Sequence, residues 1–170
     1  KRTILIRKIT IITAKHAAAL QDVLYVFKRY NMNLDINIID VAVQGINCAK
    51  SVAQAIEQIE EDNDVILITR GGGDIEDLFG FSNSLVIEAI FNCPIFTISA
   101  IGHEVDFMLS DYVADHRAPT PSIAAEYIYL NNRNYKESLD LKEKIMLDKI
   151  LQILNFNKLT LLKLDNELKN

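Results

Sequence analysis

A run of glycines with a basic residue in front of it is the stretch of this chain best suited to bind an anion. Arg70 precedes glycines 71–73, and the run directly follows the apolar segment 65–68. Glycine lets a ligand approach the backbone closely, and a guanidinium donates hydrogen bonds in a fork that fits a phosphate. A helix is predicted to open at Asp74, and its free N–H groups would add positive potential. We predict a phosphate-binding turn here; the alternative is a tight turn without a ligand.

A second group of reactive side chains lies in the stretch Gly-His-Glu-Val-Asp at 102–106. His103 titrates near neutral pH, so it can take up or release a proton during a reaction. Asp106 lies three residues further on and can orient the imidazole, hold a metal or simply cap a helix. The density of such residue types indicates an active-site segment.

Alternating strands and helices are expected to position these side chains. Strands are predicted at 9–13, 34–43, 65–68 and 94–98, and helices at 14–30, 49–60, 74–81 and 84–91. This order predicts an α/β fold with a doubly wound, mainly parallel open sheet. Ligands of such sheets gather at the carboxyl ends of the strands, which is where Arg70 lies. The long segment 99–122 is interpreted as an ordered, loop-like active-site segment.

The C-terminal part of the chain is predicted to form one long helix. Thr120 is a plausible N-cap with Pro121 at the first helical position, and no glycine or proline follows. A heptad seam predicts a coiled coil, and the alternative is an amphipathic helix packed on its own domain. The predicted domains are therefore an α/β domain at 1–121 and a helix at 122–170. The seam consists of Leu147, Ile150, Leu154, Leu161, Leu164 and Leu168, with Asn157 as a polar insertion.

Composition narrows the classes of protein to consider. The chain has 170 residues, 49% of them hydrophobic, and a net charge of −5, which argues against a protein coated with basic charge for nucleic acid. No apolar run is long enough to span a bilayer, and the N-terminus does not read as a signal peptide. Cys48 and Cys93 lack metal-site spacing and are predicted to be reduced, buried thiols in the cytoplasm. Because the chain begins with Lys1, we expect it to be part of a longer protein.

Three motifs, in order, resemble the large subunit of exodeoxyribonuclease VII. They are Thr-Arg-Gly-Gly-Gly-Asp-Ile-Glu-Asp-Leu-Phe at 69–79, Ser-Ala-Ile-Gly-His-Glu-Val-Asp at 99–106 and Ala-Asp-His-Arg-Ala-Pro-Thr-Pro-Ser at 114–122. Ala-Val-Gln-Gly at 42–45 and the segment 18–22 fit the same family. The resemblance implies hydrolysis of single-stranded DNA from both ends to oligonucleotides. Two departures are the glycine-free loop around His16 and Phe79 in place of a tryptophan.

The resemblance also implies the organisation of the complete enzyme. This chain looks like the catalytic domain and the start of the coiled-coil region, without the family's N-terminal OB-fold domain. Several copies of a small helical subunit are the implied protein partners, and no membrane is involved. Because strand capture would fall largely to the OB domain, we expect these 170 residues to bind single-stranded DNA weakly. We also expect them to self-associate through the exposed helix.

Residue roles follow from the resemblance and from the spacing of charged groups. The family's catalytic positions correspond to Asp22, Arg70, His103 and Asp106. Arg117 is predicted to contact a phosphate, or else to pair with Asp111 or Asp115. No metal is expected to be obligatory, because the carboxylates form no dense two-metal cluster; Mg²⁺, if used, would be held by Asp22 and Asp106, with Glu104 nearby. The backbone groups predicted to cradle the substrate phosphate belong to Gly71, Gly72 and Gly73.

Other functions fit parts of the sequence. A nucleotide-binding kinase would use a similar glycine-rich turn, but Ile75 stands where such kinases have a further glycine. A dinucleotide-binding oxidoreductase is disfavoured because the turn at 14–17 contains no glycine. A non-catalytic scaffold, in which the coiled coil is the function, is disfavoured by the residues that resemble a catalytic set.

Overall fold

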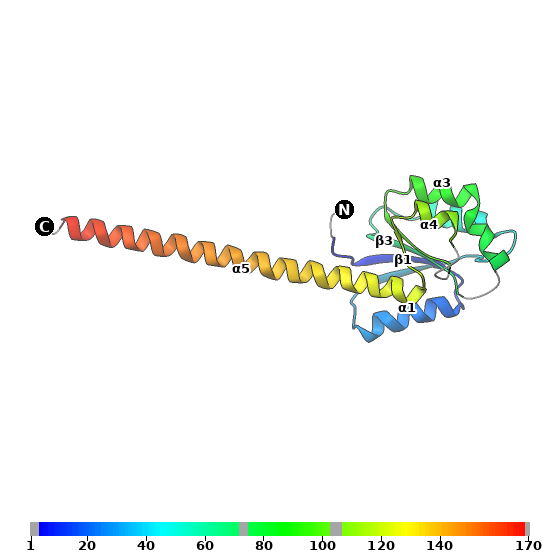
Figure 1. Ribbon diagram of the computed structural model, residues 1–170, viewed down its shortest axis with the longest axis horizontal. Coiled ribbons are helices and arrows are strands. Elements are labelled where there is room, and N and C mark those ends of the chain that lie inside the picture. Colours follow the sequence, from blue (N-terminus) through cyan, green and yellow to red (C-terminus); the bar gives the residue numbers. More distant parts are fainter. Residues whose placement is uncertain (1–3, 72–74, 103–106, 169–170) are drawn as a thin grey trace. The chain divides into compact units, whose positions relative to one another are not determined.

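The computed structural model describes residues 4–71, 75–102 and 107–168. The chain forms two compact units, residues 1–132 and 133–170. In the first unit, five parallel strands make one sheet with helices on both faces (Figure 1), which confirms the predicted doubly wound α/β fold. The strand order is β2-β1-β3-β4-β5. The strands are β1 (Lys8–Thr13), β2 (Asp35–Asp40), β3 (Val65–Thr69), β4 (Phe96–Ala100) and β5 (His116–Arg117).

Two apolar cores lie on the two faces of the sheet. Along β3, Val65 and Leu67 join the core under α1, whereas Ile66 and Ile68 join the opposite core. All four side chains are completely buried, as expected for a central strand covered on both faces. One face carries α1 (Ala18–Arg29) and the start of α5 (Pro121–Leu168). The other carries α2 (Cys48–Glu57), the 3₁₀ helix η1 (Ile75–Ser82), α3 (Ser84–Asn92) and α4 (Leu109–Val113).

The order of the strands reverses between β1 and β3. The chain leaves β1 toward α1 on one face, whereas it leaves β3 toward η1 and α3 on the opposite face. Connections that diverge in this way open a crevice at the carboxyl ends of the two strands, where open α/β sheets bind their ligands. The fold therefore positions the end of β3, with Arg70, at the edge of this crevice.

Several predicted boundaries shift by a few residues. The first helix begins at Ala18 rather than at 14, because residues 14–17 form a turn in which the Lys15 N–H donates to Asp40 Oδ1 at 2.8 Å. The second strand ends at Asp40 and the second helix at Glu57, both earlier than predicted. Of the two thiols, Cys48 is buried as predicted, whereas Cys93 is only partly buried.

The helix predicted to open after the glycine run is the 3₁₀ helix η1. The first α-helix after that run is α3, which begins at Ser84 and is capped by Asn83, whose Oδ1 accepts the Leu85 N–H at 3.0 Å. A Cβ added to Gly80 in η1 would lie 2.8 Å from Cys48 Sγ, so only glycine fits this contact with α2. The α-helical dipole expected beside the glycine run is therefore replaced by a 3₁₀ helix in the described part of this segment.

The segment 99–122, predicted to be loop-like, contains two short elements, α4 and β5. In β5, His116 pairs with Ile98 and Arg117 pairs with Ser99, which adds a fifth strand to the four predicted. The stacked rings of His116 and Tyr127, with centroids 3.7 Å apart, tie β5 to the beginning of α5. The described end of the segment therefore extends the sheet.

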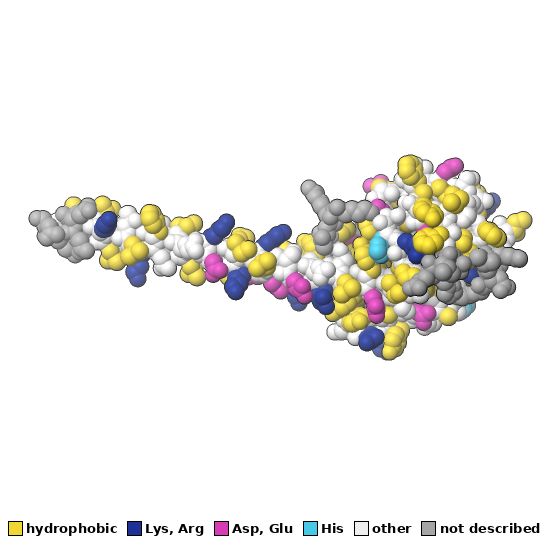
Figure 2. Space-filling view, in the orientation of Figure 1, with side chains coloured by type: hydrophobic (Ala, Val, Ile, Leu, Met, Phe, Trp, Pro, Cys, Tyr) yellow, Lys and Arg dark blue, Asp and Glu magenta, His cyan; other side chains and the backbone are white. Residues whose placement is uncertain are grey.

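The second unit consists of the remainder of α5, which runs unbroken to Leu168 and confirms the predicted long helix. Every residue from 136 to 164 is exposed, and hydrophobic side chains alternate with charged ones along the helix (Figure 2). The pairing of this helix in a coiled coil stays a prediction. Among the described residues, none of the helices combines the length and apolar character that crossing a membrane requires.

Candidate active-site crevice

A crevice with a volume of about 270 Å³ lies at the carboxyl ends of the parallel strands. Four separate stretches of the chain line it, and each follows a different strand of the sheet. This is the position that the reversal of strand order predicts for a ligand. The lining residues are 18, 19 and 22 after β1, 70–71 after β3, 100–102 at the end of β4 and 119–122 after β5.

Arg70 supplies the fixed positive charge of the crevice. Its N–H donates to the Ala100 carbonyl at 3.3 Å, and the Thr69 hydroxyl donates to the same oxygen at 3.1 Å. These bonds tie the end of β3 to the end of β4. The side chain is only 4% exposed, so its guanidinium is held in a site shielded from water, where charge-assisted hydrogen bonds to a phosphate are strong.

Asp22 brings a carboxylate to the crevice. Leu20 and Val23 of α1 are buried against the sheet, which fixes the rotation of the helix. Asp22 is four residues after Ala18, so the two share the helix face that lines the crevice. The carboxylate is solvent-exposed, which suits a group that receives a proton or orients water.

Two helix N-termini meet at the crevice. Ala18 and Ala19 open α1, whose N-cap receives no side-chain hydrogen bond and whose first turn has no acidic residue. Thr120 caps α5 as predicted, since its hydroxyl oxygen accepts the Ile123 N–H at 3.2 Å. The positive ends of both helix dipoles therefore favour an anion in this space. A helix N-terminus does contribute here, although from α1 and α5 rather than from the segment after the glycines.

Gly71 is the member of the glycine run that the structure describes at the crevice. A Cβ at this position would lie 3.6 Å from the Ala19 nitrogen, which is an ordinary contact. Gly71 is also not among the residues with positive φ. Gly71 therefore contributes its accessible backbone to the crevice, beside the first turn of α1, and does not supply an unusual backbone conformation.

Arg117 is placed differently from the prediction that it contacts phosphate. It does not line the crevice; its Nε lies 3.6 Å from Asp111 Oδ2, and its Cζ lies 3.9 Å from the centre of the Phe107 ring. The Asp111 side chain is 1% exposed and accepts hydrogen bonds from the Ser99 hydroxyl and from the Met108 N–H. The predicted alternative, an ion pair with Asp111, is therefore the arrangement present.

The family model of the exonuclease VII large subunit matches residues 1–170. The chain belongs to the exonuclease VII large-subunit family.

Three curated relatives named exodeoxyribonuclease 7 large subunit are 42–45% identical to this chain over the aligned residues. The protein of Campylobacter jejuni strain 81-176 is 42% identical over 152 residues, which are 88% of this chain and 38% of the relative. That of Shewanella denitrificans is 42% identical over 138 residues, or 80% of this chain and 31% of the relative. That of Halothermothrix orenii is 45% identical over 129 residues, which are 75% of this chain and 32% of the relative. The chain spans about a third of the length of these relatives.

The structure brings together part of the catalytic set expected for an exonuclease VII large subunit. Asp22, Arg70 and Gly71 share the crevice. His103, Asp106 and Glu104 lie outside the described residues, as do Gly72, Gly73 and Asp74. Gly102, the residue before His103, does line the crevice. The sequence did not predict that the start of α5 lines the crevice. The signal that could have indicated it is Thr120, the predicted N-cap of this helix.

The described residues of the crevice are poorly suited to hold a metal. Asp22 is the one carboxylate among the described lining residues, and the described part of the chain contains no cluster of three or more metal-ligating side chains. Mg²⁺ prefers several oxygen ligands in octahedral geometry. The described side chains alone do not make such a site, and we derive no step through a metal.

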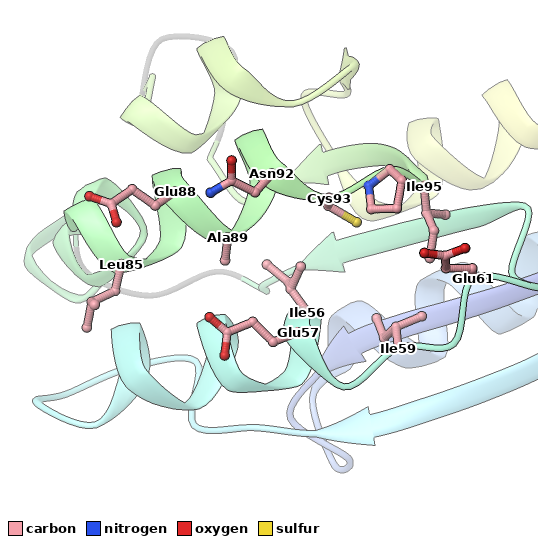
Figure 3. Close-up of a pocket in the computed structure, with 11 residues that line it drawn as sticks. Ile56, Glu57, Ile59, Glu61, Leu85, Glu88, Ala89, Asn92, Cys93 and Ile95 are labelled. Atoms are coloured by element: carbon pink, nitrogen blue, oxygen red, sulfur yellow. The ribbon is translucent and has the colours of Figure 1, made fainter.

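A larger hollow of about 350 Å³ lies between α2 and α3 (Figure 3). Ile56 and Ala89 face its interior, whereas the exposed carboxylates Glu57, Glu61 and Glu88 stand around it. Acidic side chains repel a phosphate backbone, and the lining contains no Lys or Arg to offset them. The crevice with Arg70, although smaller, is therefore the better candidate for a nuclease site.

Proposed function

We propose that this chain carries the active site with which an exonuclease VII hydrolyses phosphodiester bonds in single-stranded DNA, from both ends, to oligonucleotides. The observation that supports this proposal most strongly is the crevice in which Arg70, Asp22 and two helix N-termini converge at the ends of the parallel strands. Its polar groups match a phosphodiester, which carries one negative charge and accepts hydrogen bonds at two non-bridging oxygens. Membership of the family supports hydrolysis over the alternative of phosphoryl transfer from a nucleotide.

In this proposal a water molecule attacks the phosphorus atom and the bond from phosphorus to the leaving oxygen breaks. Arg70 and the backbone around Gly71 bind the non-bridging oxygens, and their charge stabilises the additional negative charge of the transition state. His103 takes the proton from water or gives one to the leaving oxygen, with Asp106 orienting its ring. Asp22 positions the water at the rim of the crevice.

The positive potential of the crevice is local, because the chain as a whole carries a net charge of −5. We infer that most of the affinity for DNA comes from the remainder of the full-length subunit. The exposed part of α5, residues 136–164, is the surface we assign to helical partners, namely copies of the small subunit or a second large subunit. We assign the activity to the cytoplasm, where Cys48 and Cys93, both present as thiols, stay reduced.

Digestion of single-stranded DNA labelled at either end, by the complete enzyme of large and small subunits, tests this proposal. We expect short labelled products from both labels, no turnover of ATP and little change when a chelator is added. Asp22→Asn should lower the rate about 10²-fold, whereas Asp35→Asn, which changes an exposed carboxylate of β2, should leave it unchanged. Intact DNA with ATP hydrolysis would favour the kinase instead, and complete inhibition by the chelator would establish a metal requirement.

A further inference from the structure

An exposed aromatic pair with a cation packed against one ring has no part in the proposed hydrolysis. The rings of Phe107 and Tyr112 have centroids 5.9 Å apart and are tilted by 33°. Phe107 is 51% and Tyr112 is 72% exposed. We propose that these two rings form a stacking platform for the bases of the single-stranded DNA whose phosphate occupies the crevice. This proposal rests on the proposed nuclease function.

Contacts with Arg117 and Asp111 hold the Phe107 ring of the platform in place. The Arg117 guanidinium lies 3.9 Å from the centre of the Phe107 ring, so it covers part of the ring while the remainder stays exposed. Asp111 holds this guanidinium and is itself fixed by the Ser99 hydroxyl and the Met108 N–H. Cation–π contact and a buried carboxylate thus lock one ring in place. A locked ring loses little entropy when a base stacks on it.

Charge and geometry favour a base over a phosphate on this surface. The Arg117 charge is already balanced by Asp111, whose side chain is 1% exposed. What remains accessible is the exposed surface of the aromatic rings, to which every nucleobase can stack. Centroids 5.9 Å apart leave no room for a base between the rings, which need about 3.5 Å on each side. A base must therefore stack on the outer surface of the pair.

The end of β4 connects the platform to the crevice. Ser99, which anchors the platform through Asp111, precedes Ala100, which lines the crevice. Gly102 and Phe107 are five residues apart, so their Cα atoms cannot be separated by more than about 18 Å. Ala100 belongs to the core under α1, whereas Met108 belongs to the opposite core. The DNA strand would therefore cross the carboxyl edge of the sheet, with its phosphate on one side and its bases on the other.

The first experiment locates the base on the unmodified enzyme. A phosphorothioate-linked oligonucleotide with 5-iodouracil is bound to the complete large and small subunit complex and irradiated. We expect cross-links at Phe107 or Tyr112 when the modified base lies near either end. Cross-links confined to other segments of the large subunit would overturn the proposal.

The second experiment separates base stacking from phosphate binding. Initial rates of digestion are measured for the complete enzyme with Phe107→Ala and Tyr112→Ala together, using ordinary DNA and DNA with an abasic stretch at its end. We expect KM for ordinary DNA to rise between about 5- and 100-fold. KM for the abasic DNA and the dependence of KM on salt should hardly change, because the number of phosphate contacts is the same.

A further variant controls for general loss of an exposed aromatic side chain. Phe91→Ala removes a 76% exposed ring of α3 and should leave KM unchanged for both kinds of DNA. Equal rises of KM on ordinary and abasic DNA would refute stacking. Unchanged KM together with loss of subunit assembly would show that the rings bind a protein instead. If the unmodified enzyme does not digest DNA at all, the nuclease proposal fails, and the cross-link still decides whether bases reach the rings.

Discussion

In β3 of the α/β unit, Val65, Ile66 and Leu67 are completely buried, whereas in α5 Leu154 and Leu161 are 58% and 67% exposed. Both regions are rich in large aliphatic side chains, but they use them in opposite ways. Within residues 1–132, two apolar cores cover both faces of the sheet. The helix leaves residues 136–164 exposed. The α/β unit thus covers its own apolar surface, whereas the role proposed for the helix is to bind a partner.

This contrast separates two functions that can be broken independently. Changes in the crevice should affect the reaction without affecting association, because the crevice is lined by ends of strands and helices of one unit. Changes on the helical seam should affect association without affecting the fold of the sheet. The predictions that follow test whether the division holds.

The largest effect is expected from His103→Ala in the complete enzyme. Removing a general acid or base should lower the rate of DNA digestion by about 10²–10⁴-fold while assembly stays intact. The matched control is His16→Ala, which removes an exposed histidine of the loop before α1. A His103→Ala enzyme that digests DNA at nearly the normal rate would remove this residue from the mechanism.

The next effect concerns the seam, where Leu154 and Leu161 are changed together to Glu. Two leucines buried in a helical interface contribute about 1.5–3 kcal/mol each, so self-association of the 170-residue chain should be lost in analytical ultracentrifugation. Gln152→Glu with Thr160→Glu adds the same charge off the predicted seam and should leave association unchanged. If the leucine variant sediments like the parent, the coiled-coil prediction is wrong.

A smaller effect is expected on the free energy of unfolding, which should respond differently to changes in β3 and in α5. Leu67→Ala removes a side chain with 0% exposure and should lower the free energy of unfolding by about 2–5 kcal/mol. Leu154→Ala, at 58% exposure, should change it by less than about 0.5 kcal/mol in dilute, unassociated protein. Urea unfolding of the chain, followed by circular dichroism, measures both. Similar losses from both changes would show that the helix is stabilised by contacts of its own.

The parts of the fold that could be predicted are those with strong local patterns. The apolar run 65–68 identified the central strand, and the order of strands and helices placed Arg70 at the carboxyl edge of the sheet. The resemblance singled out Asp22, and the structure places it in the same crevice as Arg70, although the two are far apart in the sequence.

Other parts of the fold depend on tertiary contacts that no local sequence pattern indicates. The strand β5 has only two residues, His116 and Arg117, and exists because it pairs with β4 and packs on Tyr127. The placement of Arg117 away from the crevice follows from the buried Asp111, a partner that the sequence allowed but could not select. Likewise, the 3₁₀ conformation of η1 accompanies a close contact between Gly80 and Cys48 that arises only in the folded chain.

The central claim is that the crevice around Arg70 is where DNA is cleaved, and the Arg70→Gln variant tests it most directly. In the complete enzyme, single-turnover digestion of end-labelled single-stranded DNA is measured together with DNA binding, with Arg29→Gln, an exposed arginine of α1, as the matched control. We predict that Arg70→Gln lowers the cleavage rate by about 10²–10³-fold and weakens DNA binding less than tenfold, while Arg29→Gln matches the parent. Cleavage by the folded Arg70→Gln enzyme at the parent rate would contradict the account.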